Sequence, residues 1–597
     1  MIHPAPSDIP DVVRIIPSSK PNSSCCSCLQ RWFLKFSRYW AIMHLSYRGG
    51  KYSVERLLAL DEYTRKHSLW HVIAVWVVSF IPAECFIIAQ ESVPLQDPAL
   101  GWQKNYGFWV RAALVIGAVL YTATVQAKYL LRGFVISNCQ LFVLVVCVVI
   151  VQMIVAVTFA ANVWFPIPFT VITLVPAFYV VSIVSICFVM GKAVIREVLT
   201  HREQLLRFGS FIASRQFMVV IYPAYQVLFH AATGTDYQLP IILLLPVIKL
   251  IVKNIALQCV AHMEDMMPEA VIFTVDFFNA LYMTTSMESA KSTSTVVIIV
   301  LIDITQSATV LFRLHRRTAT VLLRLTTVVG SVEETGSLLS MVCQLCKHYD
   351  QFEMQNRQRI KIRSCIEHNI SPQTHELLHR LDRIPRFGTF QVSRRNSAPE
   401  NRIGFNKIVM FEKRRQVVKC ATWVERQGQS VVSASEITWK SSTDIPNVTQ
   451  DAGILREALE VLFTTECLLL SAFLDAFVPF FYGIFMFVMV HLQSAKYHSE
   501  LAGVTNETIG DVVDSIFVFS VVELVALVLL AVLIYRNLGM NAVYHLAFVL
   551  ETQTELIQSK LLGWMTMTLA FRVVHFGVDF TFQFEWLSSS MRARNEL

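Results

Sequence analysis

Charged residues are scarce in this sequence. Only 16% of its 597 residues are Asp, Glu, Lys or Arg, whereas 54% are hydrophobic and the mean hydropathy is +0.50. Soluble globular proteins carry about 25% charged residues, so the composition excludes an ordinary soluble domain and predicts an integral membrane protein. The formal charge is +7, and because Lys and Arg gather beside the apolar runs, it predicts contact with a lipid bilayer and no nucleic-acid partner.

The features of a secreted protein are also missing. The N-terminus, "MIHPAPSDIPDVV", is polar and the first long apolar run begins near Leu69, so no cleavable signal peptide is expected and the first span should remain as an anchor. The thirteen cysteines are scattered. Because no predicted outer loop holds a pair of them, no disulfide framework is predicted.

Sequence patterns of several enzyme classes are absent as well. The chain has no nucleophile elbow, no Gly-Lys-Ser/Thr phosphate loop and no set of kinase signatures, so neither an enzyme nor a cofactor is predicted. An intramembrane aspartyl enzyme is the third alternative, because Asp276 and Asp303 could supply two facing acids. Neither of these acids lies in a hydrolytic motif.

Long apolar runs predict an all-α, polytopic membrane fold. A helix needs about 20 apolar residues to cross the hydrocarbon layer of a membrane. The sequence holds eleven such runs in two groups of eight and three. They lie near 69–90, 107–127, 138–161, 168–191, 216–233, 239–259, 269–287, 294–312, 465–492, 512–535 and 560–584.

The runs divide the chain into five parts. These are a cytoplasmic N-terminal segment with an interfacial helix (1–68), a bundle of eight spans (69–312), a basic and partly disordered cytoplasmic region (313–462), three further spans (463–585) and a tail (586–597). Ten Lys or Arg precede Leu69, whereas the loops 91–106, 162–167 and 234–238 hold only Lys104, so the N-terminus is predicted to be cytosolic. Asn506 begins an N-glycosylation pattern in a predicted outer loop, which agrees with this orientation.

Charged residues inside the predicted spans form a polar layer. A charged side chain at the membrane centre costs about 3 kcal/mol, so such residues are usually paired or functional. At a rise of about 1.5 Å per residue, four of them fall roughly 10–15 Å from the cytosolic boundary. These are Lys249, Asp276, Asp303 and Asp475.

Two acids of the layer carry a polar neighbour on the same helix face, because Asn279 follows Asp276 and Gln306 follows Asp303 by three residues. Lys253 is expected to point outward to the membrane surface. One lysine cannot neutralise three carboxylates, so the layer predicts a site for a cation or a proton. The competing interpretation is a neutral acid hydrogen-bonded between helices.

Four other charged residues inside the predicted spans are expected to form structural ion pairs, because the members of each pair lie at the same depth. Glu84 and Arg111 both lie near the outer ends of consecutive spans, and Glu523 and Arg572 are both central in theirs.

The cytoplasmic segments hold three candidate sites. Ser397 follows two arginines in "RRNSAPE", a pattern typical of basophilic kinase substrates, and a phosphate there could bind an arginine-bearing partner. The segment "CCSCLQRWFLKFSRYW" predicts an interfacial helix that is either unmodified or acylated at Cys25, Cys26 or Cys28. A third pattern has the spacing of a structural zinc site, although its first two cysteines could simply pack inside a helix. It consists of Cys343, Cys346, Cys365 and His368.

Two segments of the chain resemble a large family of multi-pass membrane proteins in oomycetes. They are "YRGGKYSVERLLALDEYTRKHSLWHV" at 47–72 and "HMEDMMPEAVIFTVDFFNALY" at 262–282. The family has no established activity, so the resemblance implies a shared membrane architecture and no catalytic residues.

The polar layer favours one function and leaves a second open. It predicts a cation- or proton-coupled transporter of a small solute or cation that the sequence does not identify. The alternative is a membrane receptor or scaffold that signals through the cytoplasmic region around Ser397.

Overall fold

A computed structural model describes most of the chain. It covers residues 52–288 apart from 132, 233–234, 236 and 261–263, short stretches within 305–325, residues 337–347 and 360–383, and residues 453–578 apart from 502–503 and 506. Four of the expected sites lie outside the described residues: Ser397, the glycosylation pattern at Asn506, the cysteines Cys25, Cys26 and Cys28, and the pair Asp303 and Gln306.

Every named element within these ranges is a helix, as the apolar runs predict. The helices are α2 (Val54–Lys66), α3 (Leu69–Val78), α4 (Ile81–Glu91), α5 (Tyr106–Leu130), α6 (Asn138–Asn162), α7 (Thr170–Thr200), α8 (Arg202–Ala232), α9 (Gln238–Val260), α10 (Met267–Val271), α11 (Phe277–Glu288), α13 (Leu338–Lys347), α15 (Pro372–Arg383), α17 (Ile454–Met489), α18 (Ile509–Leu538), α19 (Ala542–Thr552) and α20 (Thr554–Ala570). Short turns join them: η1 (Pro98–Leu100), η2 (Glu264–Met266), the π-helical η3 (Ile272–Asp276), η5 (Ala495–Tyr497), η6 (Ser499–Leu501) and η7 (Val574–Phe576).

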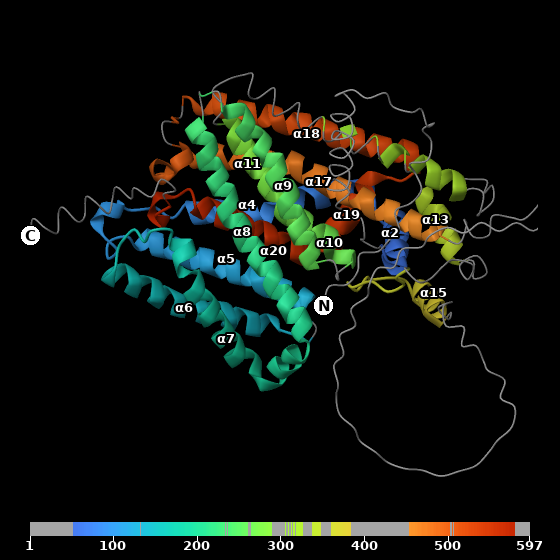
Figure 1. Cartoon of the computed structure of the whole chain (residues 1–597), viewed down its shortest axis with the longest axis horizontal. Coiled ribbons are helices and arrows are strands. Elements are labelled where there is room, and N and C mark those ends of the chain that lie inside the picture. The colour runs from blue at the N-terminus through green and yellow to red at the C-terminus, as the bar shows by residue number, and fades with distance from the viewer. Residues whose placement is uncertain are drawn as a thin grey trace, which may run out of the picture.

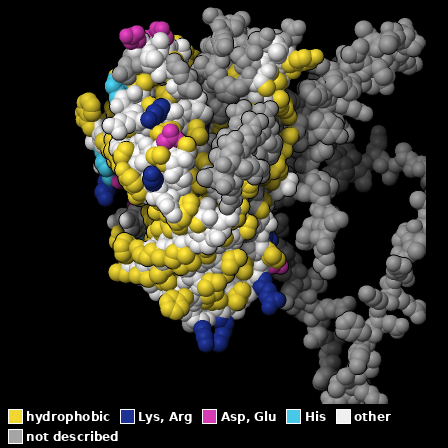
Figure 2. Space-filling model, turned by 90° about the vertical axis from the view of Figure 1, so that its left-hand side faces the viewer, with side chains coloured by type: hydrophobic (Ala, Val, Ile, Leu, Met, Phe, Trp, Pro, Cys, Tyr) yellow, Lys and Arg dark blue, Asp and Glu magenta, His cyan; other side chains and the backbone are white. Residues whose placement is uncertain are grey.

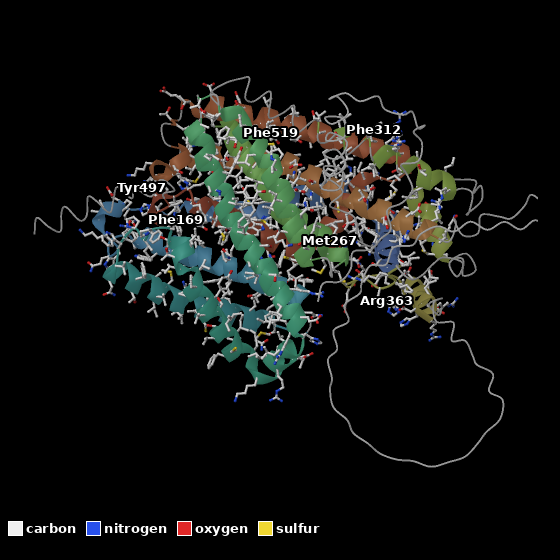
Figure 3. All side chains as sticks on the ribbon, viewed as in Figure 1. Phe169, Met267, Phe312, Arg363, Tyr497 and Phe519 are labelled. Atoms are coloured by element: carbon white, nitrogen blue, oxygen red, sulfur yellow. The ribbon has the colours of Figure 1, made fainter. Side chains whose placement is uncertain are left out.

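Several long helices, among them α5, α17 and α18, run roughly along one axis of the molecule, and α8 and α9 cross them at a steeper angle (Figure 1). The helices α2, α13 and α15 gather at one end of this axis, which we call the α15 end. The loop before α5 and the loop between α17 and α18 lie at the other end, which we call the opposite end. Figure 3 shows Arg363 toward the α15 end and Tyr497 toward the opposite end.

Seven stretches within the described residues are long and apolar enough to cross a membrane. They are Leu69–Glu91, Tyr106–Leu130, Asn138–Asn162, Thr170–Lys192, Pro240–Val260, Ile454–Met489 and Ile509–Leu538. The protein is therefore an all-α chain with the helices of a multi-pass membrane protein, and the predicted count of eleven is not supported.

Four predicted spans are not among these seven stretches, each for a separate reason. The fifth is the second half of the long, more polar helix α8, and the seventh is broken into α10, η3 and α11. Most of the eighth lies outside the described residues. The eleventh is too short, because α20 ends at Ala570 and the chain then turns back to pair His498 with Val573 in an isolated bridge.

Several spanning helices present apolar side chains to the surroundings. Phe142 of α6, Phe188 of α7 and Val518 of α18 are 70%, 87% and 65% exposed. Viewed from the opposite end, hydrophobic side chains cover the flank on the side of α6 and α7, and Lys and Arg lie at its lower edge (Figure 2). Exposed apolar faces of this extent are expected where lipid replaces water as the solvent.

The first of the two predicted intramembrane ion pairs is replaced by other contacts. Arg111 pairs with Glu91, about two helical turns beyond Glu84 on α4. It also donates to Ser494, which follows α17, at 2.6 Å. The oxygens of Glu84 are buried without a hydrogen-bond partner among the described residues. The predicted pairing of Glu84 with Arg111 is therefore wrong.

Arg572 also lies in a different environment from the predicted one. It follows the end of α20 and is not central in a span, and it pairs with Glu500 of η6. It also donates to the Tyr482 hydroxyl at 3.0 Å, whereas Glu523 lies within α18. These contacts tie the chain after α20 to the loop between α17 and α18 at the opposite end.

Segment 360–383, which was predicted to be cytoplasmic, packs against α2 at the α15 end. The side chain of Glu62 accepts hydrogen bonds from the backbone N–H and the hydroxyl of Ser371, at 2.9 and 2.8 Å, and from the hydroxyl of Thr374. Burial opposes ionisation of Glu62, but these hydrogen bonds hold its pKa below the ordinary value of 4.5. The start of α15 is therefore held to α2 by a charged acceptor.

We expect Glu62→Gln to loosen α15 without unfolding the bundle. Losing a charge-assisted acceptor costs about 1 kcal/mol, so amide hydrogen exchange in 371–383 should become about fivefold faster. Because the pKa of Glu62 is lowered on folding, the contact should persist above pH 4.5 and weaken as the pH falls through the lowered value. Unchanged exchange in 371–383 would contradict the docking role.

Candidate functional site: a buried lysine–aspartate cluster

Two lysines of α9 and one serine of α17 surround the carboxylate of Asp276. Lys249 Nζ lies 3.5 Å from Asp276 Oδ1, and Lys253 Nζ lies 3.3 Å from Oδ2. The Ser471 hydroxyl donates to Oδ2 at 2.7 Å. Asp276 is completely buried, and the side chains of Lys249 and Lys253 are 15% and 9% exposed. The structure thus brings two members of the predicted polar layer, Lys249 and Asp276, into contact.

A broken helix places Asp276 in this position. The chain from Met267 to Glu288 is helical, but its central turn, η3, is π-helical and ends at Asp276. A π-helical turn widens the helix by one residue and is frequently found at functional sites. On the facing helix α9, Pro246 lies one turn before Lys249 and removes one backbone hydrogen bond.

Two other members of the predicted layer, Asn279 and Asp475, lie within the described residues. Asn279 is buried one turn after Asp276, and its Oδ1 has no hydrogen-bond partner among the described residues. Asp475 follows Ser471 by one turn on α17, so the two share a helix face, and Asp475 is half-buried. Each of the helices α11 and α17 therefore carries a further polar side chain one turn beyond the cluster.

The position of Lys253 differs from the prediction, which placed only one lysine in the polar layer. Lys253 was expected to extend to the membrane surface, but it is buried against Asp276 together with Lys249. Among these three side chains, two can carry a positive charge and one a negative charge. Two ammonium groups therefore meet one carboxylate at this level, where a single lysine was predicted.

A small apolar cavity lies next to Phe277, the residue that follows Asp276 in the chain. The cavity, of about 20 Å³, is lined mainly by apolar side chains of α11, α17 and α20, among them Phe277, Leu281 and Phe481. It is large enough for little more than one water molecule and offers few polar partners.

A second buried charge cluster lies at the α15 end. Arg56 of α2 donates to Glu466 Oε1 of α17 at 2.7 Å and to the backbone oxygen of Asp265 at 2.9 Å. His545 Nε2 of α19 lies 3.3 Å from Glu466 Oε2. The side chains of Arg56 and Glu466 are 1% and 2% exposed. The cluster joins four distant segments of the chain, and its complete enclosure indicates a structural role.

The predicted zinc pattern does not assemble. Cys343 and Cys346 are buried on the packed face of α13, whereas Cys365 is exposed and accepts from Lys361 at 2.8 Å. His368 stacks on Phe548, and burial lowers its pKa to about 4. Within the described part of the chain these four side chains do not form a common group of metal ligands. The zinc interpretation of this pattern is therefore wrong.

The helix α15 carries a sequence motif of catalytic zinc sites that the sequence analysis missed. His375, Glu376 and His379 form His-Glu-Leu-Leu-His, the spacing that places two zinc ligands and a base on one face of a helix. The two imidazole rings are 4.6 Å apart, and Glu376 pairs with Arg380 at 2.6 Å. Within the described residues no third ligand completes this pair. The pattern alone therefore does not indicate a hydrolase.

Comparisons with protein-family models, with curated proteins and with solved structures found no match. The resemblance to the oomycete family stays a prediction, and the function has to be argued from the site itself.

Proposed function

We propose that this multi-pass membrane protein is a transporter that couples the movement of a small solute to protons at the cluster of Lys249, Lys253 and Asp276. The observation that carries the proposal is a completely buried carboxylate of η3 held by two ammonium groups of the facing helix α9. Charged groups inside membrane helices are costly and are characteristic of proton relays and substrate pathways.

The chemistry of the cluster favours a proton over a metal cation as the coupling ion. Two ammonium groups already neutralise Asp276, so a cation entering between them would meet repulsion. A lysine of the cluster could release a proton beside the Asp276 carboxylate and rebind it. The π-helical turn before Asp276 and Pro246 in α9 weaken backbone hydrogen bonding at this level, which favours two arrangements of the facing helices.

We expect Asp276→Asn to abolish solute-dependent proton flux. Asparagine keeps the shape of the side chain but cannot hold two ammonium groups, so the proton affinity of the cluster should change by orders of magnitude. Membrane current and cytosolic pH are measured in cells that express matched amounts of each variant, across a panel of common nutrients and cations. Asp511→Asn, at the exposed first turn of α18, is the matched control and should keep the wild-type flux.

A triple variant separates coupling from stability. Replacing Lys249 and Lys253 with methionine and Asp276 with leucine substitutes apolar side chains of similar size for the whole cluster, a change that often leaves stability unaltered or improved. The triple variant should remain folded and should transport nothing. A folded triple variant with wild-type proton-coupled flux would overturn the proposal.

The receptor or scaffold alternative has one observation in its favour. Residues 360–383 are tied to α2 through Glu62 and Ser371, and Glu55 accepts from the backbone N–H of Ser364 at 2.9 Å. A change in the cytoplasmic region could thus reach the bundle. The alternative predicts that Ser397→Ala, outside the described residues, impairs function while Asp276→Asn does not.

A further inference from the structure

Two histidines and one glutamate meet where the turn between α2 and α3 packs against α19. His67 follows the last residue of α2, His71 lies in the first turn of α3, and Glu551 lies near the end of α19. One ligand atom from each side chain lies within 4.8 Å of the other two. His71 Nε2 and Glu551 Oε2 are 2.9 Å apart. Tetrahedral zinc, with bonds of roughly 2.0–2.1 Å, spaces its ligands about 3.3 Å apart, so small side-chain rotations would close the site.

Neighbouring groups hold the three side chains in place. The Tyr63 hydroxyl donates to Glu551 Oε2 at 2.6 Å. The ring of His67 stacks on both Tyr63 and His71, with centroids 4.3 and 4.4 Å apart. The Ser68 hydroxyl caps α3 by accepting from the backbone N–H of His71. Hydrogen bonds of this kind to a ligating carboxylate fix its orientation and raise metal affinity.

Burial and neighbouring charges act on the pKa values of both His67 and Glu551. Burial lowers the pKa of His67, the Glu551 carboxylate opposes this shift, and His71 and Lys66 add to it. Burial opposes ionisation of Glu551, but hydrogen bonds from Tyr63 and His71 hold its pKa below the ordinary value. Neutral imidazole and ionised carboxylate are the forms that bind metals.

We propose that His67, His71 and Glu551 form a binding site for Zn²⁺, with water as the fourth ligand. Two imidazoles and one carboxylate suit zinc and related transition metals, whereas Mg²⁺ and Ca²⁺ prefer oxygen ligands alone. The side chains of His71 and Glu551 are 41% and 39% exposed, so water can reach the fourth position. The bound metal would tie the beginning of the first span to the helix that precedes α20.

The test is zinc binding to the full-length protein, purified in detergent and freed of metal with a chelator. Zn²⁺ is titrated calorimetrically, and Co²⁺ is titrated with the visible absorption that reports tetrahedral coordination. The wild type should bind about one ion per chain, and the affinity should fall as the pH drops below about 6, where imidazoles protonate. Glu551→Gln, which keeps the hydrogen bonds, should weaken binding by at least about tenfold, and His67→Ala with His71→Ala should abolish it.

The histidine pair of α15 provides the matched control. His375→Ala with His379→Ala removes two exposed histidines at the same spacing and should leave the affinity unchanged. The far-ultraviolet circular dichroism of each variant shows that it is folded. The proposal is overturned if the wild type binds no zinc, if folded Glu551→Gln binds as tightly as the wild type, or if binding is lost only in the α15 variant.

Discussion

Replacing Arg56 with methionine is expected to destabilise the protein so strongly that most of it unfolds. The change leaves Glu466 charged and buried without its ion-pair partner, which typically costs about 3–5 kcal/mol. Domains are stable by only about 5–15 kcal/mol, so a loss of this size changes the folded fraction strongly. The backbone oxygen of Asp265 also loses its hydrogen bond from Arg56, which detaches α2 from the bundle. The measurement is the fraction of detergent-extracted protein that elutes as a single folded species after heating.

Two further variants distinguish this mechanism from a general sensitivity of α2. Arg65→Met removes an exposed partner of Asp61 on the same helix, where the arginine side chain is 66% exposed, and should cost less than about 0.5 kcal/mol. Arg56→Met combined with Glu466→Leu removes both charges and should recover much of the stability lost in the single variant. If the double variant were as unstable as Arg56→Met alone, the uncompensated charge would not be the cause.

The membrane helices were predictable because their signal is local. The run Asn138–Asn162 and the run Ile509–Leu538 are both longer than a membrane is thick and carry few charges, so composition alone identifies them. The depth of a charge within such a run follows from the helical rise, which is why Lys249 and Asp276 could be placed at one level before their contact was known.

The choice of partner was not predictable, because it depends on how helices rotate and on where loops return. Arg111 lies at the depth expected for a contact with Glu84, but it pairs with Glu91, and the loop after α17 contributes Ser494 and His498 to the same cluster. Lys253 and Lys249 are one turn apart on one face, yet only the packing of α9 against η3 shows that both reach Asp276. Hydropathy carries no information on such rotations.

Small residues between α5 and α20 give a further test of how the bundle is packed. Gly563 of α20 faces Thr122 of α5, and a Cβ at position 563 would lie 2.5 Å from the Thr122 hydroxyl oxygen and 3.0 Å from its Cβ. This hydroxyl also donates across the interface to the backbone oxygen of Ser559 at 2.6 Å. Small residues let membrane helices approach closely enough for such contacts, and lipid provides no hydrophobic force to replace them.

We expect Gly563→Leu to separate α20 from α5 and to destabilise the protein by about 2–4 kcal/mol. Overpacking costs roughly 1–3 kcal/mol, and loss of the interhelical hydrogen bond adds about 1 kcal/mol. The control is Gly209→Leu in α8, where a Cβ meets no atom within 4 Å. That substitution should be neutral or slightly stabilising, since leucine favours helix over glycine by about 1 kcal/mol. Thermal unfolding in detergent compares the two. Equal stability of the two variants would mean that α20 and α5 do not meet at Gly563, and the short helix α20 would then have to be packed elsewhere in the bundle.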